Sequence, residues 1–450
     1  MKQYLSGQLL TKHELQRCIG KEVIPCSDYQ RIESIRECGR YYQCARCHNT
    51  DRQKFAYLSD AAVYCVNCIQ MGRIASGDFL YYFPAVDYEP SRIKYSQLTW
   101  SGNLSDEQAR ASRELLLSLS DTTRPHLIHA VTGAGKTEMI FASIQKVLGH
   151  GGRVCLASPR IDVCRELYPR IVAAFNKASV EIKYGGSENV RKYSDILIAT
   201  THQLLRYKSA FNLVIVDEVD AFPYVDDEML HFAVKRAVKE KIGKLVYLTA
   251  TPDAYLKKQC TDNLLTQTIL PARYHGYCLP EPEFRWVGDW RKQILKRQLK
   301  GKLYKLLLQF CQITGRRLIF MPHIELAEQL FASLSKMLPG MKIACVHSKD
   351  SDRQTKVDQF RTKTIDILIS TTILERGVTF KNCHVCVVGA EHYQYSSASL
   401  VQISGRVGRK PDFPTGTLIY AHFGYSKAMK EAAKEIHQMN QLARKKGLIQ

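Results

Sequence analysis

The sequence predicts an α/β protein in which two tandem doubly wound parallel-sheet domains follow a small cysteine-rich domain. From His126 onward, short and continuously apolar runs alternate with helix-like segments. Such runs are typical of parallel strands, because helices cover both faces of a parallel sheet. The series stops near Leu270 and then begins again, which predicts a second domain of similar size. Before His126, two Cys-x-x-Cys pairs take the place of long periodic segments.

Changes in pattern place the domain boundaries. We expect a cysteine-rich domain at residues 1–100, a first α/β domain at 101–270 and a second at 271–450. A polar linker after Pro84 ends the first domain, and an amphipathic pattern from Ser426 onward predicts a C-terminal helix. The expected strands read HLIHA, RVCLAS, DILIAT, LVIVD and KLVYLTA in the first α/β domain, and RLIFM, MKIACVH, DILIST, HVCVVGA and TLIYAHF in the second.

The composition excludes several classes of protein. The chain has 450 residues, of which 45% are hydrophobic, with 26 glycines and 15 prolines. This is too much apolar mass for a disordered chain and too little glycine and proline for a collagen-like one. No apolar run of about 18 residues predicts a membrane span, and the N-terminus lacks the apolar core of a signal peptide. We therefore expect a cytoplasmic protein whose 15 cysteines stay reduced.

The charge is unevenly distributed. The chain contains 64 Lys and Arg against 43 Asp and Glu, which gives a net charge of +21. Residues 1–100 and 101–270 each carry +3, whereas residues 271–450 carry +15. The densest basic run, Arg291–Lys305, has apolar residues at helical intervals and predicts one helix with a buried and a basic face. The excess indicates a polyanionic partner, and a basic surface that only maintains solubility is the alternative.

Four cysteines near the N-terminus have the spacing of a structural zinc site. Cys44 and Cys47 form one Cys-x-x-Cys pair, and Cys65 and Cys68 form a second pair after 17 intervening residues. Each pair can place two thiolates on one side of a Zn²⁺ ion, and two pairs complete its tetrahedral shell without leaving a position for water. His48 is an alternative ligand, and four separate core cysteines are the other interpretation.

A glycine-containing turn after the first predicted strand has the chemistry of a phosphate-binding loop. Gly133 and Gly135 allow backbone N–H groups to turn toward a polyphosphate, and the start of the next helix adds a positive dipole. Lys136 can then reach the β- and γ-phosphates of a nucleotide, and the Thr137 hydroxyl can bind Mg²⁺. The usual loop has glycine where this chain has Ala130. A chance glycine turn is the alternative interpretation.

A later strand of the same domain ends in acidic residues. The apolar run at 213–216 is followed by Asp217, Glu218, Val219 and Asp220. A carboxylate at the end of a buried strand can hold Mg²⁺ through water, and we predict this role for Asp217. Glu218 is then placed to polarise the water that attacks the γ-phosphate.

Two arginines in the second α/β domain have the spacing to approach a nucleotide together. Arg406 and Arg409 are separated by about one helical turn, and we expect them at the start of a helix. The flanking glycines, Gly405 and Gly408, leave room for close approach. An arginine beside a transferring phosphoryl group offsets its charge and can raise the rate by several orders of magnitude. Ordinary salt bridging is the alternative.

Four of these segments resemble motifs I, II, III and VI of superfamily 2 helicases. They are Ala130–Thr137, Asp217–Asp220, Thr249–Pro252 and Gln402–Arg409. They occur in the family's order, within a resemblance that covers about residues 100–425. The resemblance implies two RecA-like domains with ATP in the cleft between them. An alanine at the position of Ala130 is usual in one class of nucleic-acid motors.

The same resemblance implies a fuller set of contacts. Segments beginning at Leu104, Ser158, Thr200 and Ser370 look like the adenine-reading motif and motifs Ia, Ib and V. The implied catalytic residues are Lys136, Asp217, Glu218, Arg406 and Arg409. The implied nucleotide-binding residues are Gln108, Ala130, Val131, Thr132, Gly133, Ala134, Gly135, Lys136, Thr137 and Gly377. The implied contacts to the nucleic-acid backbone are Arg160, Thr200, Thr201 and Thr371.

The order of the domains narrows the resemblance. A four-cysteine module ahead of such a motor, in a chain of this length, is most similar to the ComFA family of late competence ATPases. Membership would imply binding to single-stranded DNA, DNA-stimulated ATP hydrolysis and work at the inner face of the cell membrane, beside the DNA uptake channel. It would also imply partners among the competence proteins, including a ComFC-type protein. Primosome-type helicases carry their zinc cysteines within the motor, whereas here both pairs precede it.

The sequence therefore favours an ATP-driven translocase on single-stranded DNA, with ATP, Mg²⁺ and Zn²⁺ as its cofactors. Unwinding of duplex DNA in replication restart or repair uses the same motifs and remains an alternative. A zinc-stapled DNA-binding scaffold with little ATPase activity is a third interpretation. Contact of the basic surface with anionic lipid is a fourth.

Overall fold

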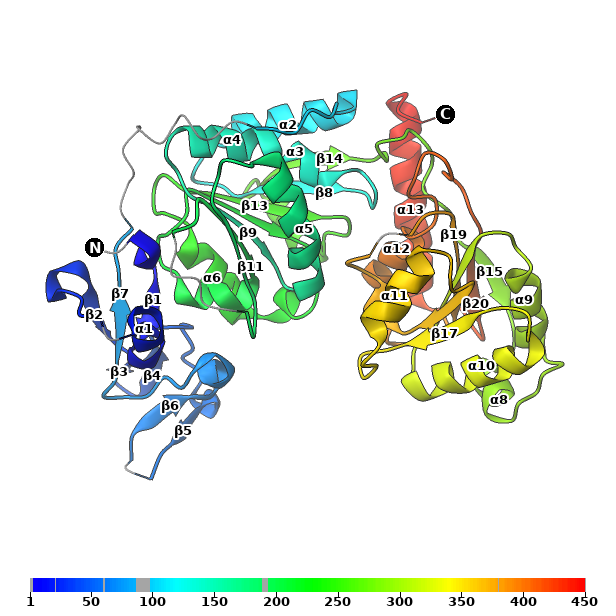
Figure 1. Cartoon of the computed structure of the whole chain (residues 1–450), viewed down its shortest axis with the longest axis horizontal. Helices are drawn as coiled ribbons and strands as arrows, with labels where there is room; N and C mark the ends of the chain where they lie inside the picture. The colour runs from blue at the N-terminus through cyan, green and yellow to red at the C-terminus, as the bar shows by residue number, and fades with distance from the viewer. Residues whose placement is uncertain are drawn as a thin grey trace. The chain divides into compact units, whose positions relative to one another are not determined.

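The computed structural model describes residues 3–20, 22–59, 61–85, 98–187, 193–378 and 380–449. The polar linker expected after Pro84 falls largely on residues 86–97, outside the described residues. The chain divides into two compact units (Figure 1). Unit 1 comprises Met1–His129 and Lys136–Ile269, and unit 2 comprises Ala130–Gly135 and Leu270–Gln450. None of the helices in the described ranges is long and apolar enough to cross a membrane.

The N-terminal part of unit 1 consists of short antiparallel strands and one capped helix. A three-stranded sheet has the order β1 (Leu9–Thr11), β7 (Phe79–Tyr82) and β2 (Gln30–Glu33). Helix α1 (Lys12–Ile19) begins with a capping box, in which Thr11 and Glu14 satisfy each other's backbone N–H groups. Two hairpins follow: β3 (Ile35–Cys38) with β4 (Tyr41–Cys44), and β5 (Phe55–Tyr57) with β6 (Val63–Cys65).

The rest of unit 1 is a seven-stranded sheet with the order β10-β11-β9-β12-β13-β8-β14. The strands are β8 (His126–Ala130), β9 (Val154–Ser158), β10 (Val180–Lys183), β11 (Ile196–Thr200), β12 (Leu213–Asp217), β13 (Lys244–Thr249) and β14 (Thr266–Leu270). The helices are α2 (Asp106–Ser118), α3 (Lys136–Met139), α4 (Phe141–Gly149), α5 (Ile161–Ala174), α6 (Glu228–Ala237) and α7 (Ala254–Thr261). All five predicted strands are confirmed, and their apolar runs are buried on both faces.

Unit 2 contains a six-stranded parallel sheet with the order β15-β20-β19-β16-β18-β17. The strands are β15 (Glu283–Trp286), β16 (Arg316–Phe320), β17 (Ile343–Val346), β18 (Ile367–Ser370), β19 (Cys383–Val388) and β20 (Leu418–His422). The helices are α8 (Trp290–Leu295), α9 (Lys302–Cys311), α10 (Ile324–Met337), α11 (Arg353–Arg361), α12 (Ser397–Ser404) and α13 (Lys427–Lys445). The five predicted strands and the C-terminal helix are confirmed.

The prediction of one long basic helix at 291–305 is wrong. The segment forms α8 and α9 with a turn between them, in which Arg297 has a positive φ of 48°. The side chain of Gln293 explains the break, because its Oε1 accepts a hydrogen bond from Leu303 N at 2.9 Å and thereby caps α9. As a consequence, Leu295 is 59% exposed rather than buried.

The N-terminal strands and the first α/β sheet share one apolar core. Strand residues Leu9 and Leu80 belong to the same buried cluster as Phe211 and Val214 of the α/β domain. Gly7, which has a φ of 73°, lies directly against Ala210 and leaves no room for a Cβ atom. Physically, the cysteine-rich part is therefore packed into unit 1 and is not a separate globule.

Two buried histidines on β8 are held neutral. His126 hydrogen-bonds to Thr266 Oγ1 at 2.8 Å and Thr268 Oγ1 at 3.1 Å, and His129 Nε2 lies 3.2 Å from Ala250 O. Burial lowers the pKa of each to about 4 from an ordinary value of 6.5.

These histidines predict a loss of stability in mild acid. Between pH 6.5 and 4 the unfolded chain binds protons that the folded chain excludes, so stability is complete above pH 6.5 and falls as the pH is lowered. Each histidine should remove about 2 kcal/mol of unfolding free energy between pH 6.5 and pH 5. Urea unfolding at the two pH values measures this change. The variant His129→Gln should reduce the difference by about one histidine's share, and an unchanged difference would contradict the assignment.

Candidate functional site

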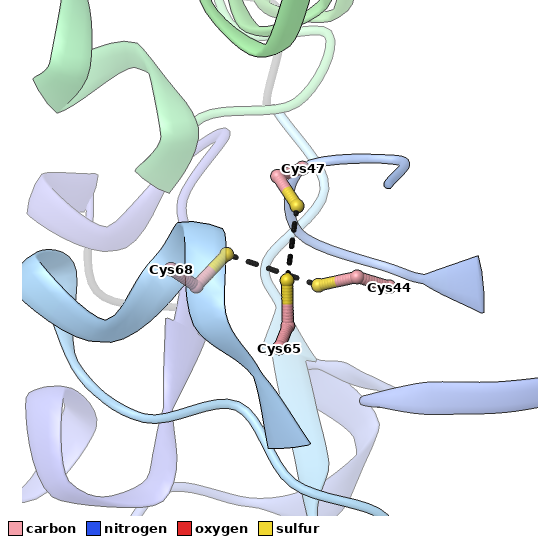
Figure 2. Close-up of side chains that lie close together, drawn as sticks. All are labelled: Cys44, Cys47, Cys65 and Cys68. Carbon is pink, nitrogen blue, oxygen red and sulfur yellow. Dashed lines mark hydrogen bonds between the residues drawn. The ribbon is translucent and has the colours of Figure 1, made fainter. Parts of the chain in front are cut away.

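The four cysteine thiols lie together in a geometry that fits a tetrahedral metal site (Figure 2). The Sγ atoms of Cys44 and Cys68 are 3.8 Å apart, and those of Cys47 and Cys65 are 3.5 Å apart. All four ligand atoms lie within 4.8 Å of one another, and all four residues are buried. Four sulfurs around Zn²⁺ at about 2.3 Å should be roughly 3.8 Å apart. The observed spacing therefore matches a closed zinc shell.

The four thiols share their protons. Hydrogen bonds among them lower the pKa of Cys44 and raise the pKa of Cys47 and Cys68. The alternative ligand His48 is occupied elsewhere, because its Nε2 lies 3.0 Å from Gln43 Nε2 and its ring stacks on Phe232. Across the described ranges, these four cysteines form the one group of three or more His, Cys, Asp or Glu residues that could hold a metal ion.

The first cysteine pair is tied to the α/β domain through a buried carboxylate. Arg46 lies between Cys44 and Cys47 in the chain, and its guanidinium is fully buried against Glu14. The other oxygen of Glu14 accepts a hydrogen bond from Arg206 Nε at 2.7 Å. Burial disfavours the ionised form of Glu14, but the charges of Arg46 and Arg206 together lower its pKa.

A second arginine joins the same two parts through backbone carbonyls. Arg236 of α6 donates to Ala45 O at 3.0 Å and Arg46 O at 2.6 Å, inside the first Cys-x-x-Cys turn. It also donates to Leu205 O at 2.8 Å and Tyr207 O at 3.2 Å. Burial lowers the pKa of Arg236 to about 10. One cation thus connects the cysteine turn to the 3₁₀ helix Thr201–Arg206.

The phosphate-loop residues stand where the sequence predicts them. Strand β8 ends at Ala130, and α3 begins at Lys136. Gly133 and Gly135 in the intervening turn have φ values of 84° and 75°, which L side chains rarely adopt. Both glycines therefore adopt the backbone conformation that the predicted phosphate-binding turn requires.

The acidic strand end belongs to unit 1, as Lys136 does. Asp217 is the last residue of β12, and its Oδ1 accepts a hydrogen bond from Glu218 N at 2.9 Å. Glu218 has a positive φ of 57°, a strained conformation for this residue type. Burial raises the pKa of Asp217, while the positive charge of Lys136 acts in the opposite direction. The carboxylate and the ammonium therefore interact electrostatically.

Asp220 links the acidic segment to the next strand. Its two carboxylate oxygens accept hydrogen bonds from the hydroxyls of Thr249, at 2.6 Å, and Thr251. Thr249 is the last residue of β13, which pairs with β12. The segment that resembles motif III therefore fixes the segment that resembles motif II.

Gln108, the predicted adenine contact, has a structural role in this conformation. Its Oε1 accepts a hydrogen bond from Ser105 N at 2.9 Å, which completes the capping box of α2. The residue is 7% exposed.

The predicted backbone contacts of unit 1 lie at one edge of its sheet. Thr200 ends β11 beside Ser158, its partner in β9, and Arg160 follows two residues later. Arg160 is partly exposed, whereas Thr200 and Thr201 are buried, Thr201 completely.

The prediction that the arginine pair stands at the start of a helix in unit 2 is wrong. Helix α12 ends at Ser404, so Arg406 and Arg409 follow its C-terminal end. The nearby segment that resembles motif V holds both: Arg406 donates to Glu375 O at 3.2 Å, and Arg409 donates to Val378 O at 3.2 Å. Thr371 and Gly377 belong to the same segment, and Gly377 has a φ of 69°.

A third arginine, which the sequence motifs do not include, lies beside the pair. Arg273 is 2% exposed and donates to Gly408 O, between the predicted pair. Burial, with the charge of Arg409, lowers the pKa of Arg273 to about 9. Arg273 belongs to no recognised motif, so no sequence signal could have identified it.

Three protein families match successive parts of the chain. The competence protein ComFA N-terminal domain matches residues 1–82, the type III restriction enzyme res subunit matches residues 101–254, and the helicase conserved C-terminal domain matches residues 300–411. The matched ranges include the cysteine cluster, the phosphate loop with its acidic strand end, and the arginine pair.

Relatives with known names cover nearly the whole chain. Competence protein ComFA of Streptococcus pneumoniae is 44% identical over 441 residues, which are 97% of this chain and 98% of that protein. Competence protein ComFA of Bacillus subtilis is 42% identical over 410 residues, which are 90% and 87% of the two chains. The fold resembles that of Saccharomyces cerevisiae Dbp5 bound to RNA and ADP BeF3, with a TM-score of 0.53 and 16% identity over 75% of this chain and 92% of that one.

These matches agree with the architecture. Both units contain the parallel RecA-like sheet of helicases, and the four-cysteine cluster precedes the motor motifs. A helicase-type ATPase fold implies ATP and Mg²⁺ as ligands. The chain belongs to the ComFA family of competence proteins, and it is a superfamily 2 helicase-like enzyme that hydrolyses ATP.

Proposed function

We propose that this protein is an ATP-dependent translocase on single-stranded DNA that drives DNA uptake during competence. The observation that carries the proposal is the conjunction of the phosphate-loop and acidic-strand motifs with a net charge of +15 over residues 271–450. Such a charge excess favours a polyanionic partner. The ComFA relatives supply the context of competence.

The proposed hydrolysis uses residues from both units. Lys136 neutralises the β- and γ-phosphates, and Thr137 and Asp217 would hold Mg²⁺, which supplies Lewis-acid stabilisation when bound. Glu218 orients the attacking water. Arg406 and Arg409, with Arg273 beside them, offset the charge that develops on the transferring phosphoryl group.

The proposed movement follows from alternate grips on the DNA backbone. Arg160 in unit 1 and Thr371 in unit 2 contact phosphates, so that closure and reopening around ATP shift the strand. Contacts of this kind carry no base preference. We further propose that the protein works beside the membrane uptake channel with other competence proteins, including a ComFC-type partner.

The decisive experiment compares ATPase rates with single-stranded DNA, duplex DNA, RNA and no nucleic acid, over a series of salt concentrations. We expect single-stranded DNA to give the highest rate. For about four phosphates neutralised by Lys and Arg side chains, the affinity for DNA should fall roughly 50-fold between 50 and 200 mM salt. Equal rates under all four conditions would refute the translocase. A strand-displacement assay on the same preparation distinguishes translocation from duplex unwinding.

A further inference from the structure

Four large aromatic side chains are exposed at the carboxyl edge of the unit 2 sheet. They are Trp286 (54% exposed), Tyr393 (83%), Phe423 (49%) and Tyr425 (65%). We call this set the edge platform. Large aromatic side chains are usually buried, so several at one edge of a sheet indicate a surface that binds something.

The strand pairing places these residues at the same edge of the sheet. Trp286 ends β15 directly beside His422, the last residue of β20, so Phe423 and Tyr425 follow at the same edge. The loop after β19 is held against β20, because Gly389 N donates to Ala421 O at 2.8 Å. This loop carries Tyr393. The platform is thus assembled from the ends of three adjacent parallel strands.

Cations accompany the rings. Lys302 Nζ lies 4.3 Å from the ring centroid of Trp286, and Lys430 Nζ lies 5.8 Å from that of Tyr425. Arg291 lies 4.5 Å from the centroid of the buried Trp290 beneath the loop. Ring faces flanked by ammonium and guanidinium groups can bind stacked bases and the phosphates between them.

Two carboxylates, Asp289 and Glu391, follow strands β15 and β19 at this edge and keep their negative charge. Asp289 accepts a hydrogen bond from Lys292 N at 3.0 Å, and Glu391 accepts one from Trp290 Nε1 at 2.7 Å. The three cations beside the rings, Lys302, Lys430 and Arg291, outnumber these two carboxylates. This charge balance favours a polyanion over an acidic or neutral protein surface as the occupant.

The same edge continues toward the proposed DNA contacts of this unit. His392, in the platform loop, lies 3.0 Å from His323, the residue before helix α10. His323 follows β16, and β18 beside it leads into Thr371. Because the strands are parallel, all of these ends face one side of the sheet. A DNA strand bound at Thr371 could therefore continue along this edge of the sheet to the edge platform.

We propose that the edge platform stacks the bases of single-stranded nucleic acid. The proposal rests on the proposed function, and it adds a contact to the bases where the motor motifs contact the backbone. Stacking does not depend on sequence, because every base has a π-face. It would hold the strand while the backbone grips exchange.

Fluorescence anisotropy with a labelled oligothymidylate of about 20 nucleotides tests the proposal. Tyr393→Ala and Tyr425→Ala should each weaken binding about tenfold, with an unchanged dependence on salt, because stacking releases no counterions. Tyr393→Trp should bind the oligothymidylate with the affinity of the wild-type protein, because tryptophan also offers a ring for stacking. The matched control is Tyr255→Ala, whose ring is 57% exposed in unit 1. ATP hydrolysis without DNA should stay at the wild-type rate in all of these variants.

An abasic oligonucleotide of the same length separates stacking from backbone contacts. The wild-type protein should bind it more weakly, and the alanine variants should lose nothing further. The proposal would be overturned if both alanine variants kept their affinity for the oligothymidylate. It would also be overturned if they kept that affinity and lost only their affinity for a protein partner. Failure of the wild-type protein to bind either oligonucleotide would instead overturn the proposed function.

Discussion

Replacing Lys136 with alanine is expected to lower the rate of ATP hydrolysis by about 10²–10³-fold, the cost of losing one positioned charge at a phosphoryl-transfer site. Lys136 follows the Gly133–Gly135 turn and acts electrostatically on Asp217. Its removal takes away the cation that we propose binds the phosphates and the charge that favours ionised Asp217. The measurement is the steady-state release of phosphate at saturating ATP and Mg²⁺.

Lys146→Ala is the matched control, because Lys146 lies on α4 of the same unit and is exposed. We expect that variant to hydrolyse ATP at the wild-type rate. A Lys136→Ala protein with normal hydrolysis would show that the turn binds no nucleotide phosphate. The outcome does not depend on DNA, so it tests the ATP site separately from the translocase.

Replacing Cys68 with serine should remove the metal and destabilise unit 1. Cys68 is buried in the core cluster that also contains Phe211 and Val214, so the metal shell and the α/β core share a boundary. We expect a loss of about 4 kcal/mol and a fall of about 10 °C in the melting temperature. Metal analysis should find one zinc for each wild-type chain and almost none in the variant.

The control for this variant is Cys26→Ser, because Cys26 is exposed and lies outside the cluster. It should keep its zinc and its melting temperature. A strong chelator should lower the melting temperature of the wild-type protein to that of Cys68→Ser and leave Cys68→Ser unchanged. Zinc-free wild-type protein with a normal melting temperature would contradict the structural role.

The sequence predicts the central strands of both sheets well because burial on both faces leaves a continuous apolar run. It does so for β8, whose five residues are all buried. The edge strand β15 has no such run, since three of its four residues are exposed. The sequence predicts short motifs with a defined chemistry equally well. The two cysteine pairs are an example, because a few residues at fixed spacing supply all four thiols.

Features that depend on distant contacts could not be predicted. The break between α8 and α9 depends on Gln293, whose capping of Leu303 has no local signature. The position of Arg406 after α12 depends on the backbone of Glu375 in another segment. Sequence pattern alone therefore predicts one continuous helix across residues 291–305 and a helix that begins at Arg406, and both predictions are wrong.

The contacts of Arg236 and Glu14 have a consequence for how the protein can be divided. A fragment that begins after residue 100 would lose the carbonyls of Ala45 and Arg46 and leave Arg236 buried without those acceptors. The N-terminal part is therefore an integral part of unit 1 that cannot be removed without exposing buried groups. A partner that binds the cysteine-rich part would be fixed to the α/β domain of unit 1 as well, so force applied by the partner would be transmitted directly to that domain.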